Sequence, residues 1–228
     1  MNKPIIIALD FPESGEAIRF SEKLDPSLCR LKVGKELFTS SGPLLVETLM
    51  KKGFDIFLDL KFHDIPNTVA SACKAAASLG VWMVNVHALG GSAMMKKARE
   101  ALQESPCKLI AVTLLTSMGL EEIREIGLQG EPEDIVERLA MLAKSSGLDG
   151  VVCSGLEAAR LRKKFGKDFC LVTPGIRPSG SDAHDQKRVM TPKMAMSNGS
   201  DYLVIGRPIR EAVDPNRALE AIMQEIGR

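Results

Sequence analysis

Eight short runs of mostly apolar residues recur along the chain, and amphipathic segments separate them. The runs cover residues 4–10, 29–34, 55–61, 82–87, 108–115, 149–154, 169–176 and 202–207. Apolar runs of this length, bounded by turn residues, are typical of buried strands, whereas the segments between them repeat apolar residues at helical spacing. The pattern therefore predicts eight alternating strand–helix units.

Residues that start and stop helices support this division. Pro43 begins one apolar-faced segment and Gly53 follows its end, which is the usual order of proline first and glycine last. Ser154 and Glu157 have the spacing of a capping box. Pro215 begins a final segment whose apolar residues fall on one helical face. These signals place helices directly after several of the predicted strands.

The number of units indicates the fold. Eight strand–helix units in a chain of 228 residues, without a Gly/Ser-rich linker or a change in composition, predict a single (β/α)8 TIM barrel domain over residues 1–228, with eight parallel strands. An open doubly wound α/β sheet is the alternative. It is less favoured because the repeat count is eight and no glycine-rich nucleotide turn follows the first strand.

Composition narrows the classes of partner. The chain carries 30 basic and 29 acidic residues, for a formal net charge of +1, and it has no long basic run. We therefore expect no nucleic-acid partner, although a small anionic substrate remains possible. No apolar run approaches the length of a membrane span, and no signal peptide is visible, so we expect a cytoplasmic protein without membrane association.

The five cysteines give no sign of a metal site. Their number is odd, they form no CxxC pair, and most lie inside apolar runs. The sequence predicts buried free thiols in a reducing compartment and no structural zinc.

Polar residues gather where the predicted strands end. In a barrel these ends converge on one mouth, where functional groups are found. The residues at the ends are Asp10, Lys32, Asp59, Lys61, His87, Thr116, Ser117, Arg177 and Arg207. Any one of them is compatible with an ordinary strand end, but the set predicts a polar site at the mouth.

The stretch FLDLKFHDIPNT, residues 57–68, carries the densest charge pattern. Strand alternation sends Asp59 and Lys61 to the same face, and Asp64 follows just before the next helix. With Lys32 on a neighbouring strand, the four charges are expected to alternate in sign, which keeps each lysine and each carboxylate ionised.

This stretch resembles the signature of the orotidine 5′-monophosphate decarboxylase family, in its shorter bacterial form. The resemblance extends over the chain through IALDF (7–11), LKVGKELF (31–38), NVHALGG (85–91), IAVTLLTS (110–117), VTPGIR (172–177), DQKRVMTP (185–192) and IGRPI (205–209). It implies decarboxylation of orotidine 5′-monophosphate (OMP) to UMP and CO2, the last step of UMP synthesis, without a cofactor or metal ion.

The resemblance also implies a role for each site residue. Lys61 would be the catalytic lysine within the array Lys32–Asp59–Lys61–Asp64. The remaining residues would bind the substrate: Asp10 and Lys32 at the ribose, Thr116 and Ser117 at the ribose and pyrimidine, Gln186 between base and phosphate, and Arg177, Gly206 and Arg207 at the 5′-phosphate. Barrels often bind phosphate on the loops after strands seven and eight, which agrees with the last group. The polar segment 178–186 would fold over the phosphate.

A homodimer is implied as well, in which Asp64, Ile65 and Thr68 complete the partner's site. His63 and His87 lie near the motif, and we interpret both as hydrogen-bonded structural residues rather than proton carriers.

Two other functions remain open from the sequence. One is a Mg2+-dependent decarboxylase or aldolase acting on sugar phosphates, which would share the Asp-x-Lys-x-x-Asp pattern. The other is a silent barrel that only binds nucleotides or a protein. The segments HDIPNT and TLLTS together with Gln186 disfavour the first, and the intact Asp59, Lys61 and Asp64 disfavour the second.

Overall fold

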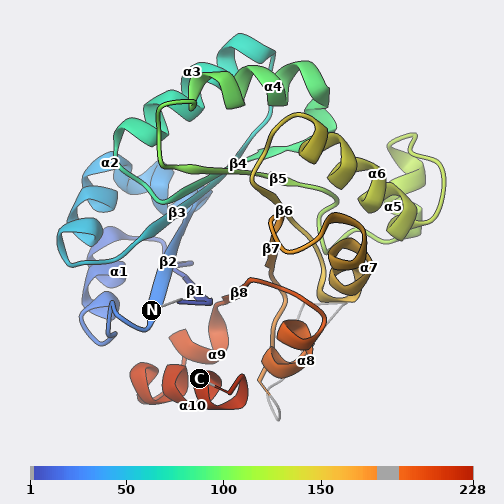
Figure 1. Cartoon of the computed structure of the whole chain (residues 1–228). Coiled ribbons are helices and arrows are strands. Elements are labelled where there is room, and N and C mark those ends of the chain that lie inside the picture. Colours follow the sequence, from blue (N-terminus) through green and yellow to red (C-terminus); the bar gives the residue numbers. More distant parts are fainter. Residues whose placement is uncertain (1–2, 179–189, 228) are drawn as a thin grey trace.

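A computed structural model describes residues 3–178 and 190–227. Eight parallel strands pair in sequence order, and the last pairs with the first, so that they close into a barrel (Figure 1). The strands are β1 (Ile5–Ala8), β2 (Cys29–Gly34), β3 (Ile56–Phe62), β4 (Met83–His87), β5 (Lys108–Val112), β6 (Gly150–Val152), β7 (Cys170–Thr173) and β8 (Tyr202–Ile205). The barrel predicted from the eight apolar runs is confirmed, and the open sheet is wrong.

Helices surround the barrel on its outside (Figure 1). They are α1 (Ser14–Ser21), α2 (Lys35–Lys51), α3 (Pro66–Ser78), α4 (Gly91–Ala101), α5 (Leu120–Glu125), α6 (Pro132–Ser145), α7 (Gly155–Phe165), α8 (Pro192–Ser197), α9 (Arg207–Arg210) and α10 (Pro215–Glu225), with a short 3-10 turn at Ala88–Gly90. None of the helices in the described ranges is long and apolar enough to cross a membrane.

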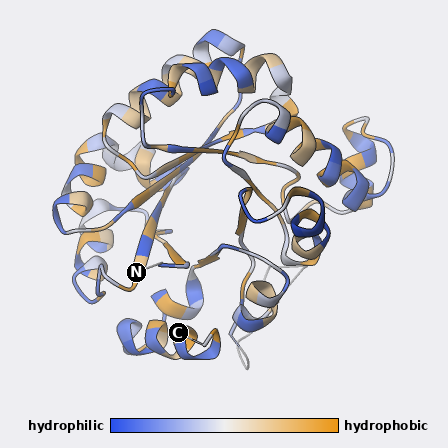
Figure 2. Ribbon diagram, in the orientation of Figure 1, coloured by the Kyte–Doolittle hydropathy of each residue, from blue (hydrophilic) through white to orange (hydrophobic). Residues whose placement is uncertain are grey.

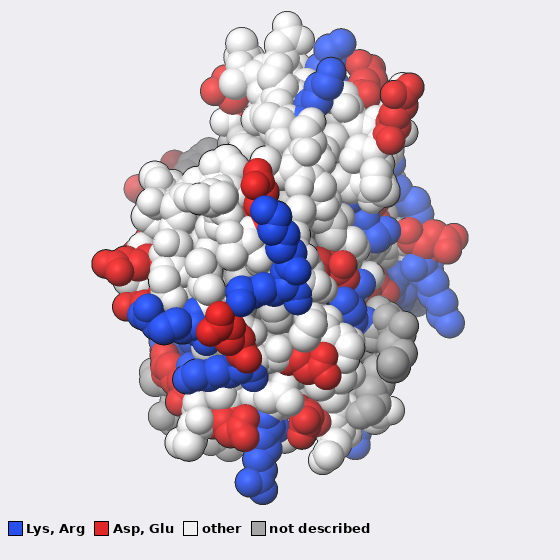
Figure 3. Space-filling view, turned by 90° about the vertical axis from the view of Figure 1, so that its left-hand side faces the viewer, with Lys and Arg blue, Asp and Glu red and all other residues white. Residues whose placement is uncertain are grey.

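Alternation along each strand separates two apolar cores. On β1, Ile5 and Ile7 pack with the surrounding helices, whereas Ile6 and Ala8 pack with residues of other strands inside the barrel, among them Phe57. Figure 2 shows the strands as predominantly hydrophobic and the helices as two-sided. The polar face of each helix is left to solvent. Figure 3 shows basic and acidic side chains interspersed on one outer face of the molecule, as the balanced composition predicts.

The predicted helix ends are largely confirmed. The Ser154 hydroxyl accepts a hydrogen bond from the Leu156 N–H, and Glu157 accepts one from the Ser154 N–H at 2.8 Å, which completes the capping box. Helix α2 differs from its prediction because it begins at Lys35 rather than at Pro43. Gly42 interrupts it with a φ of 65°, and Pro43 opens its second part.

All five cysteines are buried and free, as predicted. Burial raises the pKa of the Cys73 thiol to about 12 and that of the Cys107 thiol to about 11. These thiols therefore pack as small apolar groups and stay protonated at neutral pH.

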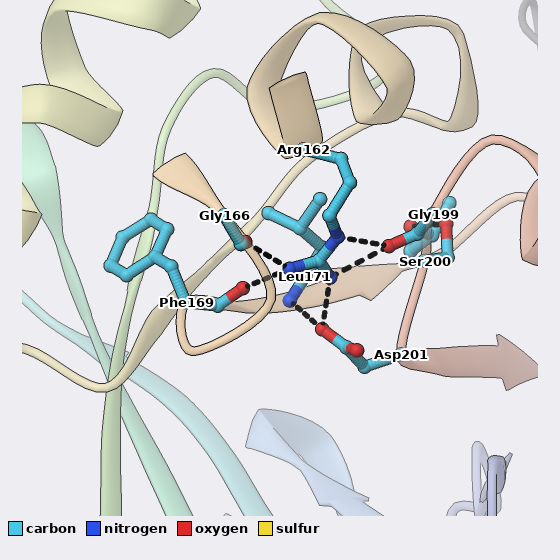
Figure 4. A network of polar contacts seen from close by, with 8 residues as sticks. Arg162, Gly166, Phe169, Leu171, Gly199, Ser200 and Asp201 are labelled. Carbon is cyan, nitrogen blue, oxygen red and sulfur yellow. Dashed lines mark hydrogen bonds and ion pairs between the residues drawn. The ribbon is translucent and has the colours of Figure 1, made fainter. Parts of the chain in front are cut away.

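A polar network joins α7 to the chain segments that enter β7 and β8 (Figure 4). The Arg162 guanidinium, on α7, donates hydrogen bonds to three backbone carbonyls and contacts the Asp201 carboxylate at 2.5 Å. Asp201 also accepts a hydrogen bond from the Leu171 N–H at 2.7 Å. The carbonyls belong to Gly166, Phe169 and Gly199. One side chain thus ties together the chain segments that enter the last two strands.

Candidate active site

A cavity of about 500 Å³ opens at the C-terminal ends of the strands. This volume is typical of a site for a small molecule. Its lining includes most of the predicted site residues: Asp10, Lys32, Asp59, Lys61, Thr116, Arg177, Gly206 and Arg207. Apolar side chains from the strand interiors form its floor: Ala8, Phe57, Val112, Val152, Val172 and Val204.

One side of the cavity carries an alternating row of charges. The Lys61 Nζ lies 2.6 Å from Asp59 Oδ1, and the Lys32 Nζ lies 3.3 Å from Asp59 Oδ2. Lys32 also approaches Asp10 Oδ1 at 3.5 Å. Each carboxylate oxygen of Asp59 therefore faces an ammonium group, and three members of the predicted array lie together within one subunit.

The buried carboxylate of Asp59 stays ionised. Burial alone would raise its pKa, but the charges of Lys32 and Lys61 and the hydrogen bonds from Lys61 and Asn85 outweigh burial and hold the pKa below its ordinary value. The network therefore places a fixed negative charge between two ammonium groups at neutral pH.

The part of the cavity at the ends of β7 and β8 can hold an anion. Arg177 follows β7 and is buried, and Arg207 begins α9 directly after β8. Gly206 directly precedes Arg207, and it lets the backbone approach a ligand closely because it has no side chain. A cationic fork next to accessible backbone N–H groups is suited to binding phosphate.

The structure does not bring every predicted residue into this cavity. Asp64, Ile65 and Thr68 are exposed around the start of α3, and the Asp64 carboxylate accepts a hydrogen bond from the Ile65 N–H at 2.6 Å. Within the described ranges no ion pair joins Asp64 to Lys61 or Lys32. Ser117 is exposed beyond β5 and does not line the cavity.

Two predictions fall on residues outside the described ranges. They are Gln186 and, apart from Pro178, the segment 178–186 that was expected to cover the phosphate.

The two histidines lie beside the charged row. Their rings are 5.5 Å apart, and in the described part of the chain neither imidazole makes a hydrogen bond, so the expected hydrogen-bonded role is not found. Burial, His63, Lys35 and Lys61 lower the pKa of His87 to about 4, although Asp59 acts in the opposite direction. His87 is therefore neutral at physiological pH.

Sequence reasoning missed two polar residues of the site. Arg210, at the end of α9, lines the cavity and donates a hydrogen bond to the Asp10 backbone carbonyl. Asn85, on β4, is fully buried and donates a hydrogen bond to Asp59 Oδ1 at 2.7 Å. Asn85 lies within a run of apolar residues, where only its polar side chain could have drawn attention to it.

In the described ranges, His, Cys, Asp and Glu side chains form no group of three or more that could hold a metal ion.

Comparison with known proteins identifies the family. Residues 3–222 match the sequence model of the orotidine 5′-phosphate decarboxylase / HUMPS family. The chain belongs to this family. It is 62% identical to an orotidine 5′-phosphate decarboxylase from Nitrosospira multiformis, over 99% of this chain and 95% of the relative. It is 61% identical to one from Nitrosomonas europaea, over 100% of this chain and 99% of the relative.

A solved structure agrees. The crystal structure of an orotidine 5′-phosphate decarboxylase from Lactobacillus acidophilus superposes with a TM-score of 0.90 at 44% identity, covering 99% of this chain and 100% of that one. The barrel and the order of its elements are therefore those of a decarboxylase of known structure.

Proposed function

We propose that the protein catalyses the decarboxylation of OMP to UMP and CO2 in pyrimidine biosynthesis. The observation that carries the proposal is the Lys61 ammonium, held 2.6 Å from the ionised Asp59 inside a nucleotide-sized cavity. Family membership and the close relatives named as this decarboxylase support the choice of substrate.

Lys61 stabilises the negative charge that forms at C6 of the pyrimidine during the reaction. Breaking the bond between C6 and the carboxylate leaves an electron pair in the plane of the pyrimidine, where the π system of the ring does not stabilise it. A fixed ammonium beside C6 stabilises this charge as it develops. Its proton then passes to C6, CO2 departs, and the lysine regains a proton from solvent. We expect this chemistry to need no cofactor.

A single ion pair does not supply the whole effect. Two unit charges 4 Å apart interact by about 4 kcal/mol at an effective dielectric constant near 20. Asp59 contributes by holding the ammonium in place, and its charge faces the substrate carboxylate that departs. Binding of the remote phosphate supplies further energy for closing and ordering the site.

The substrate would span the cavity from the charged row to the arginines. In our proposal Asp10 and Lys32 hold the ribose hydroxyls, and Thr116, which lines the cavity, contacts the ribose and the base. Gln186 bridges the base and the phosphate. The phosphate binds to Arg177, Gly206 and Arg207, of which the arginines provide planar donor groups that match its oxygens.

A rival reaction in the same family is Mg2+-dependent chemistry on a sugar phosphate. To separate the two, the purified protein should be assayed with OMP in the presence of EDTA and with sugar phosphates in the presence of Mg2+. We expect absorbance loss from OMP that EDTA does not reduce. Turnover of a sugar phosphate that EDTA abolishes, without turnover of OMP, would reject the proposal.

We further propose a homodimer, in the cytoplasm, in which Asp64, Ile65 and Thr68 complete the partner's site. The exposure of these residues supports this placement: Ile65 is 67% exposed although it is a large apolar side chain.

Mixed dimers test the shared site. Lys61→Ala and Asp64→Asn homodimers should each be severely impaired. Refolding the two chains together at equal ratio makes about half of the dimers mixed, and each mixed dimer regains one intact site, so activity should recover to roughly a quarter of wild type. If tagged chains prove that mixed dimers formed but activity stays at the parental level, Asp64 does not serve the partner's site.

A further inference from the structure

The strand that carries the catalytic motif departs from regular pairing at the motif itself. Leu58 of β3 pairs with Val84 of β4, but the next pair joins Phe62 to Val86. Four steps along β3 thus match two steps along β4, so the chain bulges over residues 59–61 opposite Asn85. Bulges disturb the ladder of hydrogen bonds and redirect side chains, and they occur often beside active sites.

Lys61 has an unusual backbone conformation within this bulge. Its φ is 53°, and in the described part of the chain it is the one non-glycine residue with a positive φ. For such a residue the left-handed region costs about 1–2 kcal/mol. Strain of this kind persists only where surrounding contacts hold the residue in place.

Asn85 makes the contacts that hold it. The Asn85 Oδ1 accepts a hydrogen bond from the Lys61 backbone N–H at 2.8 Å, and the Asn85 Nδ2 donates one to Asp59 Oδ1 at 2.7 Å. The amide orientation is fixed by chemistry, because a backbone N–H needs an acceptor and an ionised carboxylate needs a donor. The side chain of Asn85 thus supplies an acceptor to the Lys61 N–H where the pairing of β3 with β4 is irregular.

These contacts close a ring. Asp59 Oδ1 accepts hydrogen bonds from both the Asn85 amide and the Lys61 ammonium, and the Asn85 amide in turn binds the Lys61 backbone. Lys61 is therefore held at both ends, at its backbone N–H and at its Nζ. Asn85 is fully buried, so water does not compete for either bond.

We propose that Asn85 is a positioning residue for the reaction. It stabilises the left-handed backbone of Lys61, fixes the Asp59 carboxylate, and thereby aims the ammonium at the reacting carbon. The inference rests on the proposed function for the identity of the reaction, but its structural part concerns Lys61 alone.

The first test is Asn85→Ala, which removes both hydrogen bonds. Misplacing a catalytic group by about 1 Å can lower the rate about 100-fold. We expect kcat for OMP to fall by about that factor, while the dissociation constant of UMP changes less than about threefold, because the phosphate and ribose contacts are intact. A kcat within threefold of wild type, or a parallel loss of kcat and UMP affinity, would overturn the proposal.

The second test is Asn85→Asp, which keeps the size of the side chain. An ionised carboxyl at this position accepts from the Lys61 N–H but repels Asp59, whereas a protonated one accepts and donates as the amide does. The charged groups near this position are Asp59 and Lys61 on β3, and Lys32, which pairs with Asp59. The titratable group on β4 is His87, which is neutral at physiological pH. On β5 the paired residue is the apolar Ile110.

We expect kcat of Asn85→Asp to rise as the pH falls, by up to about tenfold per pH unit as the introduced carboxyl gains its proton. Wild type should lack this rise. A variant with the wild-type profile would show that the amide does not act through Asp59.

A crystal structure of Asn85→Ala provides a readout that does not need activity. We expect Lys61 to leave the positive-φ region and its Nζ to move away from Asp59. An unchanged Lys61 would refute the positioning role even if kcat fell. If wild-type protein does not turn over OMP, the proposed function fails, and this structure still decides whether Asn85 holds Lys61.

Discussion

The network around Arg162 should stabilise the fold without contributing to catalysis. It joins α7 to the segments that enter β7 and β8, at the N-terminal end of the barrel and opposite the cavity. Residues at that end of a TIM barrel contribute to stability. Arg162→Ala should therefore lower the free energy of unfolding and leave kcat per folded molecule unchanged.

The expected loss in the free energy of unfolding follows from the contacts that Arg162 makes. The substitution removes the ion pair with Asp201 and the donors to three carbonyls. Breaking a buried, hydrogen-bonded charge pair typically costs about 3–5 kcal/mol. The side chains of Arg162 and Asp201 are 17% and 37% exposed. We therefore expect Arg162→Ala to lower the free energy of unfolding by an amount at the lower end of this range, about 3 kcal/mol.

Arg160, two residues earlier on the same helix, is the matched control. It pairs with Asp134 and Glu137 on α6, but its side chain is 44% exposed. Exposed ion pairs contribute little. Arg160→Ala should therefore lower the urea concentration at the midpoint of unfolding much less than Arg162→Ala does. Arg162→Lys should fall between Arg162→Ala and wild type, because an ammonium pairs with Asp201 but does not reach all three carbonyls.

The assay is urea unfolding followed by circular dichroism, at one chain concentration for all variants because association changes apparent stability. If Arg162→Ala and Arg160→Ala shift the midpoint equally, the network does not stabilise the barrel as argued. If Arg162→Ala lowers kcat per folded molecule, the separation of this network from the cavity is wrong.

Two further predictions concern the site. Arg207→Ala should weaken binding of UMP far more than binding of uridine, measured by calorimetry, because the lost donors contact only the phosphate; equal losses would place Arg207 elsewhere. The pKa of His87 is lowered to about 4, mainly by burial and also by His63, Lys35 and Lys61, although Asp59 acts in the opposite direction. His87 therefore binds its proton more weakly in the folded than in the unfolded protein. Stability should fall as the pH drops from about 6.5 to 4. His87→Gln should show a smaller drop in urea midpoint between pH 7 and pH 5, and an unchanged drop would mean that His87 is not the group responsible.

Much of the fold was predictable because its determinants are local. Apolar runs bounded by turn residues specify strands. When eight such strands alternate with helices, few folds can bury every strand on both faces, and the closed barrel is one of them. The convergence of Lys32, Asp59 and Lys61 also followed from position alone, because parallel strand ends in a closed barrel meet at one mouth.

The parts that were missed depend on contacts between distant segments. The role of Asn85 follows from a slip in register between β3 and β4, and no residue pattern within either strand specifies such a slip. Arg210 reaches the cavity only because the short α9 turns directly after β8. The first part of α2 was not predicted, because Gly42 and Pro43 interrupt the helix and the proline was interpreted as the first residue of a helix.

The central claim is that the Lys61 ammonium performs the chemistry while other residues bind the nucleotide. The most direct measurement compares the rate of OMP absorbance loss for wild type and Lys61→Ala, with UMP binding measured on the same preparations. Our account predicts that Lys61→Ala loses nearly all turnover and still binds UMP, because the ammonium is needed where charge develops in the transition state. Turnover within about tenfold of wild type would contradict it, since a missing charge-stabilising group typically lowers kcat by more than about 100-fold.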